Sequence, residues 1–221
     1  MVATARILDR ASDPEASRDQ VRESAKLHQI LDGARKVFLS DGFDGASMND
    51  IARAAGVSKG TLYAYFDSKE ALFQALVRNE KHGQAERVCS FATGEADIVT
   101  TLRGVGRRMV EMLTQPDNVA ILRMVIGVVG KFPEIGRAFY EAGPKFGLEK
   151  LTLYLDQQVA AGLLNIQDTA TAASNFMNLS HSEIVKSQMF GMVESVSSEE
   201  IGKSIENAID IFMRAYAPTD K

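Results

Sequence analysis

Lysine, threonine and tyrosine side chains are concentrated between residues 59 and 69, and these residue types suit the binding of nucleic acid. Ammonium and hydroxyl groups donate hydrogen bonds to phosphate oxygens, and an aromatic ring can contact a thymine methyl group or a sugar edge. A glycine in the same stretch lets the backbone approach such a ligand closely, and a helix that begins there adds partial positive charge at its N-terminus. These residues predict a surface that contacts phosphates and base edges: Lys59, Gly60, Thr61, Tyr63, Tyr65 and Lys69.

The charge balance requires such binding to be local. The chain has a formal net charge of -4, and residues 18–70 hold eight basic and eight acidic side chains. A protein that coats or wraps DNA through bulk electrostatics needs widespread positive charge instead. The placement of a few side chains must therefore matter more than the total charge.

Two short helices would position this surface. Ser47 followed by Asp50 has the form of a capping box, which predicts the start of a helix over residues 48–55. Ser58 can cap a second helix, over residues 59–65, in the same way. The surface residues would then lie on this second helix and just beyond it.

The connection between the two helices predicts a sharp turn. Gly56 can adopt the positive φ that ends one helix and redirects the chain into the next. The segment from Ser47 to Phe66 therefore predicts a helix-turn-helix, in preference to an ordinary helical hairpin that would not require the polar surface. Its crossing contacts would come from Ile51, Ala55, Val57 and Leu62.

Flanking helices must supply the supporting core. An apolar face along residues 30–38 predicts a first helix that begins near residue 24 and stops at Asp41-Gly42. A fourth helix would run from residue 69 to about residue 90, and the core between the two would contain Phe38, Leu72, Phe73 and Leu76. Residues 1–23 show no sustained apolar period, so we expect a mobile arm there.

In the remainder of the chain, apolar residues also recur at helical spacing, and no segment shows the alternating pattern of a strand. Pro116, Pro133, Pro144 and Pro218 all fall between periodic stretches, where a missing N–H does least harm. The predicted fold class is all-α, with about nine to ten helices. The expected C-terminal helices cover residues 97–114, 118–131, 133–141, 144–161, 169–192 and 199–216.

Several function classes are disfavoured. The single cysteine, Cys89, excludes an intramolecular disulfide, and the isolated histidines do not suggest a metal site, so we expect no metal and no cofactor. The sequence shows no nucleophile elbow or phosphate-binding glycine loop, which argues against an enzyme. No apolar run is long enough for a membrane span, and we expect a cytoplasmic protein.

The region from Ile30 to Leu76 resembles the tetracycline-repressor (TetR) family of bacterial transcription regulators. The resemblance includes the Gly42-Phe43 turn, the Ala55-Gly56-Val57 turn, Leu62-Tyr63 and Lys69. It implies a DNA-binding domain over residues 24–84, a helical regulatory domain over 85–217 and a short tail over 218–221. Carried over position by position, the family's DNA contacts fall on Ser47, Ser58, Lys59, Gly60, Thr61, Tyr63, Tyr65 and Lys69.

Two positions depart from the family pattern. Ala64 replaces a larger side chain that often reaches DNA in other members, so base reading there should be weaker. Gly33 stands within the first helix where the family usually has alanine, which costs about 1 kcal/mol of helix propensity. Gly33 therefore indicates either close packing or no special role.

The resemblance also implies a homodimer that usually represses transcription and leaves its DNA when a small molecule binds the C-terminal domain. The last two long helices, 169–192 and 199–216, would pair with those of a partner subunit. One helix-turn-helix reads only a half-site, so the expected target is a palindromic operator. More loosely, Phe132-Pro133-Glu134-Ile135 and Gly162-Leu163-Leu164 are similar to the subgroup related to multidrug-efflux regulators.

Methionine and aromatic side chains of the C-terminal domain could line a hydrophobic effector pocket, although helical spacing also fits plain core. The candidates include Met124, Met177 and Met189, and those we select are Met109, Met112, Phe139, Phe146, Tyr154 and Phe176. The sequence does not identify the effector. A transcriptional activator and an effector-independent DNA-binding protein of the same fold stay open as alternatives.

Overall fold

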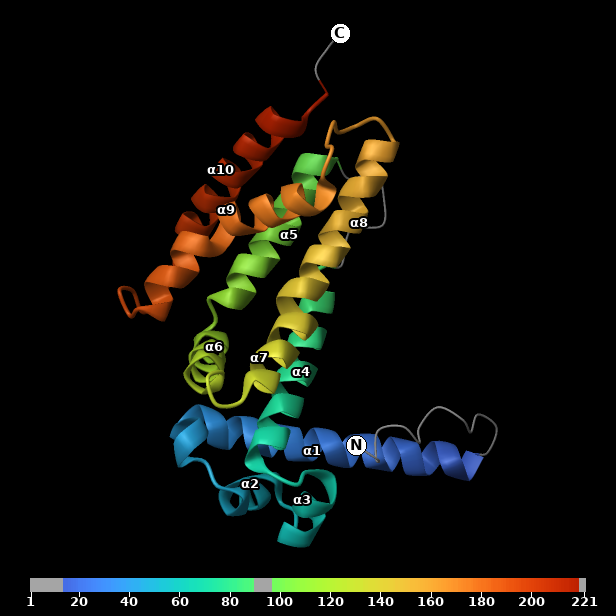
Figure 1. The fold of residues 1–221 in the computed structure, drawn as a ribbon, viewed down its shortest axis with the longest axis vertical. Coiled ribbons are helices and arrows are strands. Elements are labelled where there is room, and N and C mark those ends of the chain that lie inside the picture. Colours follow the sequence, from blue (N-terminus) through green and yellow to red (C-terminus); the bar gives the residue numbers. More distant parts are fainter. Residues whose placement is uncertain (1–13, 90–96, 219–221) are drawn as a thin grey trace. The chain divides into compact units, whose positions relative to one another are not determined.

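The computed structural model describes residues 14–89 and 97–218 of the 221-residue chain (Figure 1). Every regular element in these two ranges is helical, as the sequence predicts. The chain divides into two compact units, residues 1–76 and 77–221, which we call the head and the body. The boundary between these units lies within a helix, between Leu76 and Val77.

The head contains α1 (Pro14–Gly45), α2 (Met48–Ala55), α3 (Lys59–Tyr65) and the first part of α4 (Lys69–Val88). The body contains the rest of α4, then α5 (Ile98–Leu113), α6 (Pro116–Val128), α7 (Pro133–Tyr140) and the π-helical turn η1 (Glu141–Lys145). It ends with α8 (Phe146–Ala160), α9 (Thr169–Met189) and α10 (Ser198–Tyr216). None of the described helices is long and apolar enough to cross a membrane.

Helix α1 begins earlier than predicted. The expected arm is wrong for residues 14–23, which are helical, while residues 1–13 lie outside the described part of the chain. Pro14 suits the first turn of a helix, and the residues after it are mostly straight-chain helix formers. The side chains of residues 21–25 are exposed, so this part of α1 lacks the apolar periodicity by which sequence analysis identifies a packed helix.

The break expected at Asp41-Gly42 is present. Gly42 has φ 71° and ψ 176°, which interrupts the helical backbone before one more turn ends at Gly45. A side chain with a Cβ rarely adopts this φ, so glycine is required here.

Three phenylalanine rings form the centre of the head. The ring centroids of Phe38 and Phe73 are 4.8 Å apart, and those of Phe43 and Phe73 are 5.2 Å apart, both in tilted arrangements. Phe38, Leu72, Phe73 and Leu76 are at most 2% exposed, which confirms the predicted core between the first and fourth helices.

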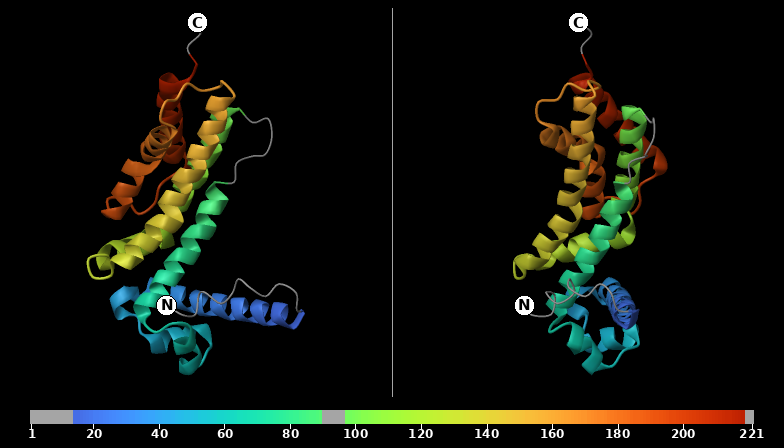
Figure 2. Two further views of the ribbon diagram at one scale, coloured as in Figure 1. Left: turned by 45° about the vertical axis from the view of Figure 1, so that its right-hand side comes forward. Right: turned by 90° about the vertical axis from the view of Figure 1, so that its right-hand side faces the viewer.

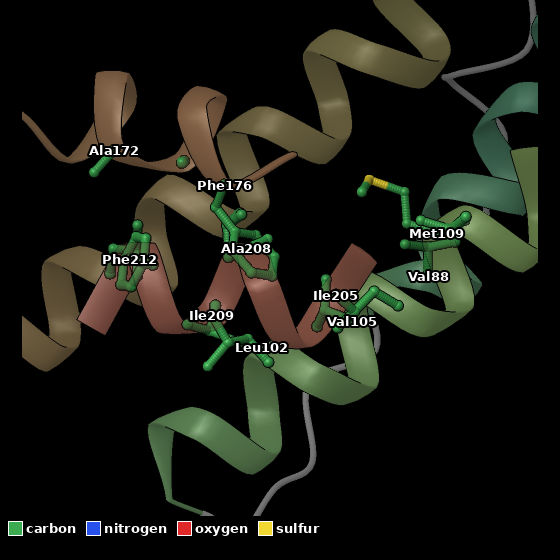
Figure 3. Close-up of a cluster of buried hydrophobic side chains, with 14 of the residues drawn as sticks. Val88, Leu102, Val105, Met109, Ala172, Phe176, Ile205, Ala208, Ile209 and Phe212 are labelled. Carbon is green, nitrogen blue, oxygen red and sulfur yellow. The ribbon is translucent and has the colours of Figure 1, made fainter. Parts of the chain in front are cut away.

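The body has its own apolar core, formed mainly by α5, α8, α9 and α10 (Figure 3). Phe176 and Phe212 meet edge to face at 5.8 Å, and a Cβ on Gly106 would lie 3.3 Å from the Phe176 ring. The absence of a side chain at Gly106 thus lets α5 approach α9 and α10 closely. α9 and α10 pack side by side, as both views of Figure 2 show.

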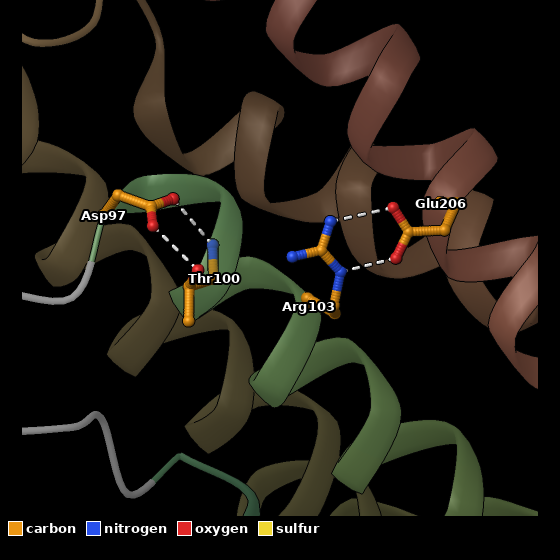
Figure 4. A network of polar contacts seen from close by, with 4 residues as sticks. All are labelled: Asp97, Thr100, Arg103 and Glu206. Carbon is orange, nitrogen blue, oxygen red and sulfur yellow. Dashed lines mark hydrogen bonds and ion pairs between the residues drawn. The ribbon is translucent and has the colours of Figure 1, made fainter.

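An exposed polar link also joins α5 to α10 (Figure 4). The Arg103 guanidinium donates hydrogen bonds to both carboxylate oxygens of Glu206, at 2.5 and 2.9 Å. Asp97 caps the start of α5 by accepting from the backbone N–H of Thr100 at 2.9 Å, which lowers the pKa of its carboxyl group. Surface pairs of this kind stabilise a fold by at most about 1 kcal/mol, so the apolar core holds these helices together.

Two helices of the body begin at a proline. Pro133 is the first residue of α7, as predicted, and Pro116 is the first residue of α6, two residues before the predicted start. Pro144 differs from the expectation, because the chain stays helical through it. It lies inside η1, where the wider π turn joins α7 to α8.

Candidate DNA-binding site and effector cavity

Helix α2 begins at the predicted cap. The backbone N–H of Asp50 donates to the Ser47 hydroxyl oxygen at 3.2 Å, and the Ser47 hydroxyl donates to the Asp50 carboxylate at 2.5 Å. Arg53 forms an ion pair with the same carboxylate at 3.2 Å. The hydroxyl proton of Ser47 is therefore engaged within the cap, so direct donation to a phosphate requires it to leave Asp50.

The turn after α2 has the predicted left-handed glycine. Gly56 has φ 63° and ψ 36°, and its backbone N–H donates to the Arg53 carbonyl oxygen at 3.1 Å. The N–H of Val57 reaches the Ala52 carbonyl oxygen at 3.0 Å. These two bonds satisfy carbonyl groups that the helix end leaves free, and they fix the direction in which α3 begins.

Gly33 holds α1 against the end of α2. A Cβ at Gly33 would lie 2.5 Å from both the Cβ and the backbone nitrogen of Ala55, so the close-packing interpretation of this glycine is the one that the structure supports. From the same helix, the Gln29 side chain donates to the Ala55 carbonyl oxygen at 2.6 Å. Together these contacts position the helix-turn-helix on α1.

Helix α3 exposes the predicted recognition residues around one buried anchor. Leu62 is fully buried, whereas the side chain of Lys59 is exposed and Tyr63 is 47% exposed. Lys59 and Tyr63 are one helical turn apart and share a face. The Lys59 side chain forms no hydrogen bond or ion pair with other described residues, so its three N–H donors are available for a ligand.

The remaining α3 residues differ in how freely they can act. The Ser58 hydroxyl oxygen accepts from the Thr61 backbone N–H at 3.0 Å and lies 2.8 Å from the Thr61 hydroxyl. Gly60 and Ala64 are exposed, and Tyr65 is half-buried. Lys59, Gly60 and Tyr63 are therefore the most accessible members of the predicted contact set.

Lys69 has a different environment from Lys59. Its ammonium group donates to the carbonyl oxygens of Phe43 at 2.6 Å, Ala46 at 2.9 Å and Asp44 at 3.2 Å, and it lies 4.7 Å above the Phe43 ring. All three N–H donors are thus used by the end of α1. The phosphate contact of Lys69 stays a prediction, and this arrangement gives the residue a structural role at the end of α1.

The body contains a cavity of about 440 Å³, lined mostly by apolar side chains from α4 to α6, the α7–η1–α8 region and α9. Of the selected pocket candidates, Met109, Met112 and Phe139 line it. Met177, from the wider set of candidates, lines it as well. A volume of this size suits a small organic ligand.

Phe146, Tyr154 and Phe176 are not among the residues that line this cavity. Phe176 is fully buried in the core, and Tyr154 packs against that core, where burial raises the pKa of its phenol. The ring of Phe146 instead lies edge-on to that of His82 at 5.2 Å. We predicted these three residues as pocket residues because they are aromatic. An aromatic side chain can equally line a cavity or pack in the core, so residue type alone does not distinguish the two.

Sequence analysis missed the polar lining residues. Lys81 and Gln84 come from α4, and Ser174, Asn178 and His181 come from one face of α9. The spacing of the α9 residues, i, i+4 and i+7, was the available signal, because polar residues repeating on one helical face need a common environment. Burial lowers the pKa of His181 and so favours the neutral form of its ring.

Cys89 also lines the cavity. Burial raises the pKa of its thiol, against the opposing influence of the positive charges of Arg108 and Lys150. The thiol is therefore less reactive than an exposed one at neutral pH.

The capped α2, the left-handed turn and the exposed face of α3 define a helix-turn-helix, the reading element of a class of DNA-binding transcription regulators. Residues 30–76 match the family model "Bacterial regulatory proteins, tetR family", and residues 100–218 match "AefR-like transcriptional repressor, C-terminal domain". The chain belongs to the TetR family. Its resemblance to the multidrug-efflux subgroup stays a prediction.

Two curated relatives are similar in sequence to part of this chain. The HTH-type transcriptional repressor Rv1474c of Mycobacterium tuberculosis is 34% identical over 131 residues, which cover 58% of this chain and 63% of that protein. The HTH-type transcriptional repressor AcnR of Corynebacterium glutamicum is 36% identical over 77 residues, 35% of this chain and 38% of that protein. The matches thus span less than two thirds of either relative.

Two solved structures cover nearly the whole fold. A TetR-family regulator from Mesorhizobium loti superposes with a TM-score of 0.84 at 26% identity, covering 89% of this chain and 99% of that one. The flavonoid-responsive regulator FrrA superposes with a TM-score of 0.73 at 32% identity, covering 89% of this chain and 100% of that one.

Proposed function

We propose that this protein is a transcriptional repressor, and not an enzyme, that binds a palindromic operator as a homodimer and leaves it when a small hydrophobic effector enters the body cavity. The exposed Lys59–Tyr63 face of α3, held by a capped helix-turn-helix, is the observation that carries the proposal. Curated relatives are named as repressors, which supports the direction of regulation. A repressor that binds such an operator would act in the cytoplasm.

The contact set divides by accessibility. Lys59 would donate to a phosphate oxygen or a guanine edge, and Tyr63 would contact a thymine methyl group or a sugar. Gly60 would let the backbone of α3 approach the DNA. Ser47, Ser58, Thr61 and Tyr65 would contribute at the rim, where the hydroxyl groups of the first three are shared with helix caps.

The cavity argues against an effector-independent DNA-binding protein. A body with a well-filled interior would fit such a protein better, whereas about 440 Å³ of mostly apolar space fits a ligand site. The fold of FrrA is similar to this chain along the full length of FrrA, and FrrA is named as responsive to flavonoids. This supports an aromatic effector of comparable size here. A reporter gene whose promoter contains the operator would distinguish repression from activation.

Operator binding tests the role of α3. We expect Lys59→Ala and Tyr63→Ala each to weaken binding to DNA from upstream of the protein's own gene by roughly tenfold or more, since each removes a contact of about 1–3 kcal/mol. Binding is measured by fluorescence anisotropy at fixed salt concentration.

Lys131→Ala is the matched control, because it removes an exposed lysine from the body and not from the head. It should leave the affinity within about twofold of the native value. Native affinity in both α3 variants would overturn the assignment of α3 as the reading helix.

A further inference from the structure

The wall that α9 contributes to the body cavity has three polar side chains. Ser174, Asn178 and His181 line the space, and Met177 and Val185 lie on the same face of the helix. The cavity as a whole is lined mostly by apolar side chains. A polar group next to apolar space costs free energy unless it forms a hydrogen bond, so the partners of these three side chains decide what the wall can bind.

His181 has no such partner in the described structure. Its ring is half-buried, Nδ1 is enclosed by protein without a hydrogen bond, and the side chain forms no hydrogen bond or ion pair with other described residues. Burial lowers the pKa of the ring and favours its neutral form, which has one N–H donor and one acceptor nitrogen. Because Nδ1 is enclosed, Nε2 is the nitrogen available to a ligand.

Ser174 and Asn178 add unused hydrogen-bonding groups beside this ring. The side-chain amide of Asn178 donates to the Ser174 hydroxyl oxygen at 3.3 Å. The Ser174 hydroxyl proton and the Asn178 side-chain carbonyl oxygen form no hydrogen bond with other described residues. Residues 174, 178 and 181 therefore present a donor, an acceptor and an imidazole nitrogen over about 10 Å of one helical face.

The geometry points to a mainly apolar molecule with a hydroxyl group as the ligand of the cavity, its hydroxyl bonded to Nε2 of His181 and its carbon skeleton held by the apolar walls. This inference rests on the proposed function, in which the cavity holds the effector. A hydroxyl group both donates and accepts, so it pairs with Nε2 whichever ring nitrogen carries the proton. A pure hydrocarbon would leave the imidazole unpaired in a space from which it has displaced water.

A matched pair of small aromatic probes tests the recognition of the hydroxyl group. 2-Naphthol and 2-methylnaphthalene have the same ring system and differ in a hydroxyl or a methyl group of similar size. The methyl compound is the more hydrophobic, so apolar burial alone favours it. We expect the native full-length chain to bind 2-naphthol about three- to tenfold more tightly, as one neutral hydrogen bond would provide.

Isothermal titration calorimetry measures both affinities. Binding of 2-naphthol should also slow alkylation of Cys89 by iodoacetamide, since this thiol lines the cavity and reports its occupancy.

Variants assign the preference to His181. His181→Phe keeps a planar ring without nitrogens and should weaken 2-naphthol binding about three- to tenfold while leaving 2-methylnaphthalene within about twofold. His181→Gln keeps a hydrogen-bonding group and should retain part of the preference. His82→Phe is the matched control, because His82 is an exposed histidine of α4 that does not line the cavity, and it should change neither affinity.

Thermal unfolding separates ligand binding from a structural role. The His181 nitrogens form no hydrogen bond with other described residues, so His181→Phe should keep or raise the unfolding midpoint. A lowered midpoint would mean that the ring stabilises the fold through its nitrogens, which would count against their availability to a ligand.

The native chain alone can overturn the inference, either by failing to bind 2-naphthol or by binding 2-methylnaphthalene as tightly. An unchanged preference in folded His181→Phe would also overturn it. If the preference depends on His181 and Cys89 is protected, but hydroxylated compounds never release the operator, the proposed effector function fails while the recognition of the hydroxyl group stands.

Discussion

At the scale of single residues, Gly33 shows how packing can reverse the effect of intrinsic propensity. Alanine is better than glycine in a helix by about 1 kcal/mol, so propensity alone predicts that Gly33→Ala stabilises the head. A Cβ there would lie 2.5 Å from the backbone nitrogen of Ala55, and backbone cannot move aside as the tip of a side chain can. We expect Gly33→Ala to lower the free energy of unfolding by about 1–3 kcal/mol, the usual cost of overpacking.

Gly127→Ala is the control for this prediction. Gly127 is an exposed residue of α6, and a Cβ there would meet no atom within 4 Å. It should gain stability by up to about 1 kcal/mol. Urea unfolding followed by circular dichroism compares the two midpoints, and a rise in both variants would show that the contact between α1 and α2 relaxes freely.

At the scale of elements, Lys69 connects the start of α4 to the end of α1. Its three hydrogen bonds satisfy carbonyl groups that follow the break at Gly42. We therefore expect Lys69→Met to destabilise the head by roughly 1–3 kcal/mol, because the carbonyl groups lose their donor. The salt dependence of operator binding should stay unchanged, whereas loss of a phosphate contact would lower the slope by about 1.

Lys59→Met should give the opposite pattern, since the Lys59 side chain is exposed and makes no hydrogen bond or ion pair with other described residues. It should leave the unfolding midpoint unchanged and lower the salt slope by about 1. If Lys69→Met had a normal unfolding midpoint and a lowered salt slope of operator binding, Lys69 would be a phosphate contact as first predicted.

The elements themselves were largely predictable, because caps, glycines and apolar periods act locally. Ser47, Gly56 and Ser58 determine the ends of α2 and α3 through contacts within three or four residues, and those ends match the prediction. The environments of Lys69 and Lys81 were not predictable. Their partners, such as Phe43 and Asn118, are far away in the sequence. The sequence letter for lysine does not show whether the side chain faces solvent or donates to an oxygen of the protein.

At the scale of the whole molecule, the exposed apolar residues of α9, α10 and the connection between them favour a partner subunit. Leu179 and Ile211 are each 41% exposed, and Phe190 and Met192, in the connection, are more than 70% exposed. A helical pair with such a surface can bury it against the same pair of a second copy about a twofold axis. We expect Leu179→Glu combined with Ile211→Glu to give a monomer, because two like charges per subunit would then be buried in the interface.

Light scattering after size-exclusion chromatography measures the mass, and Ile126→Glu is the matched control, because Ile126 is a 57% exposed residue of α6. The control should remain dimeric. A monomer has one recognition helix for a half-site, so the double variant should also bind the palindrome far more weakly while its α3 stays intact. A dimer that survives both glutamates would place the interface elsewhere, and weak operator binding by that dimer would then have to arise within the head.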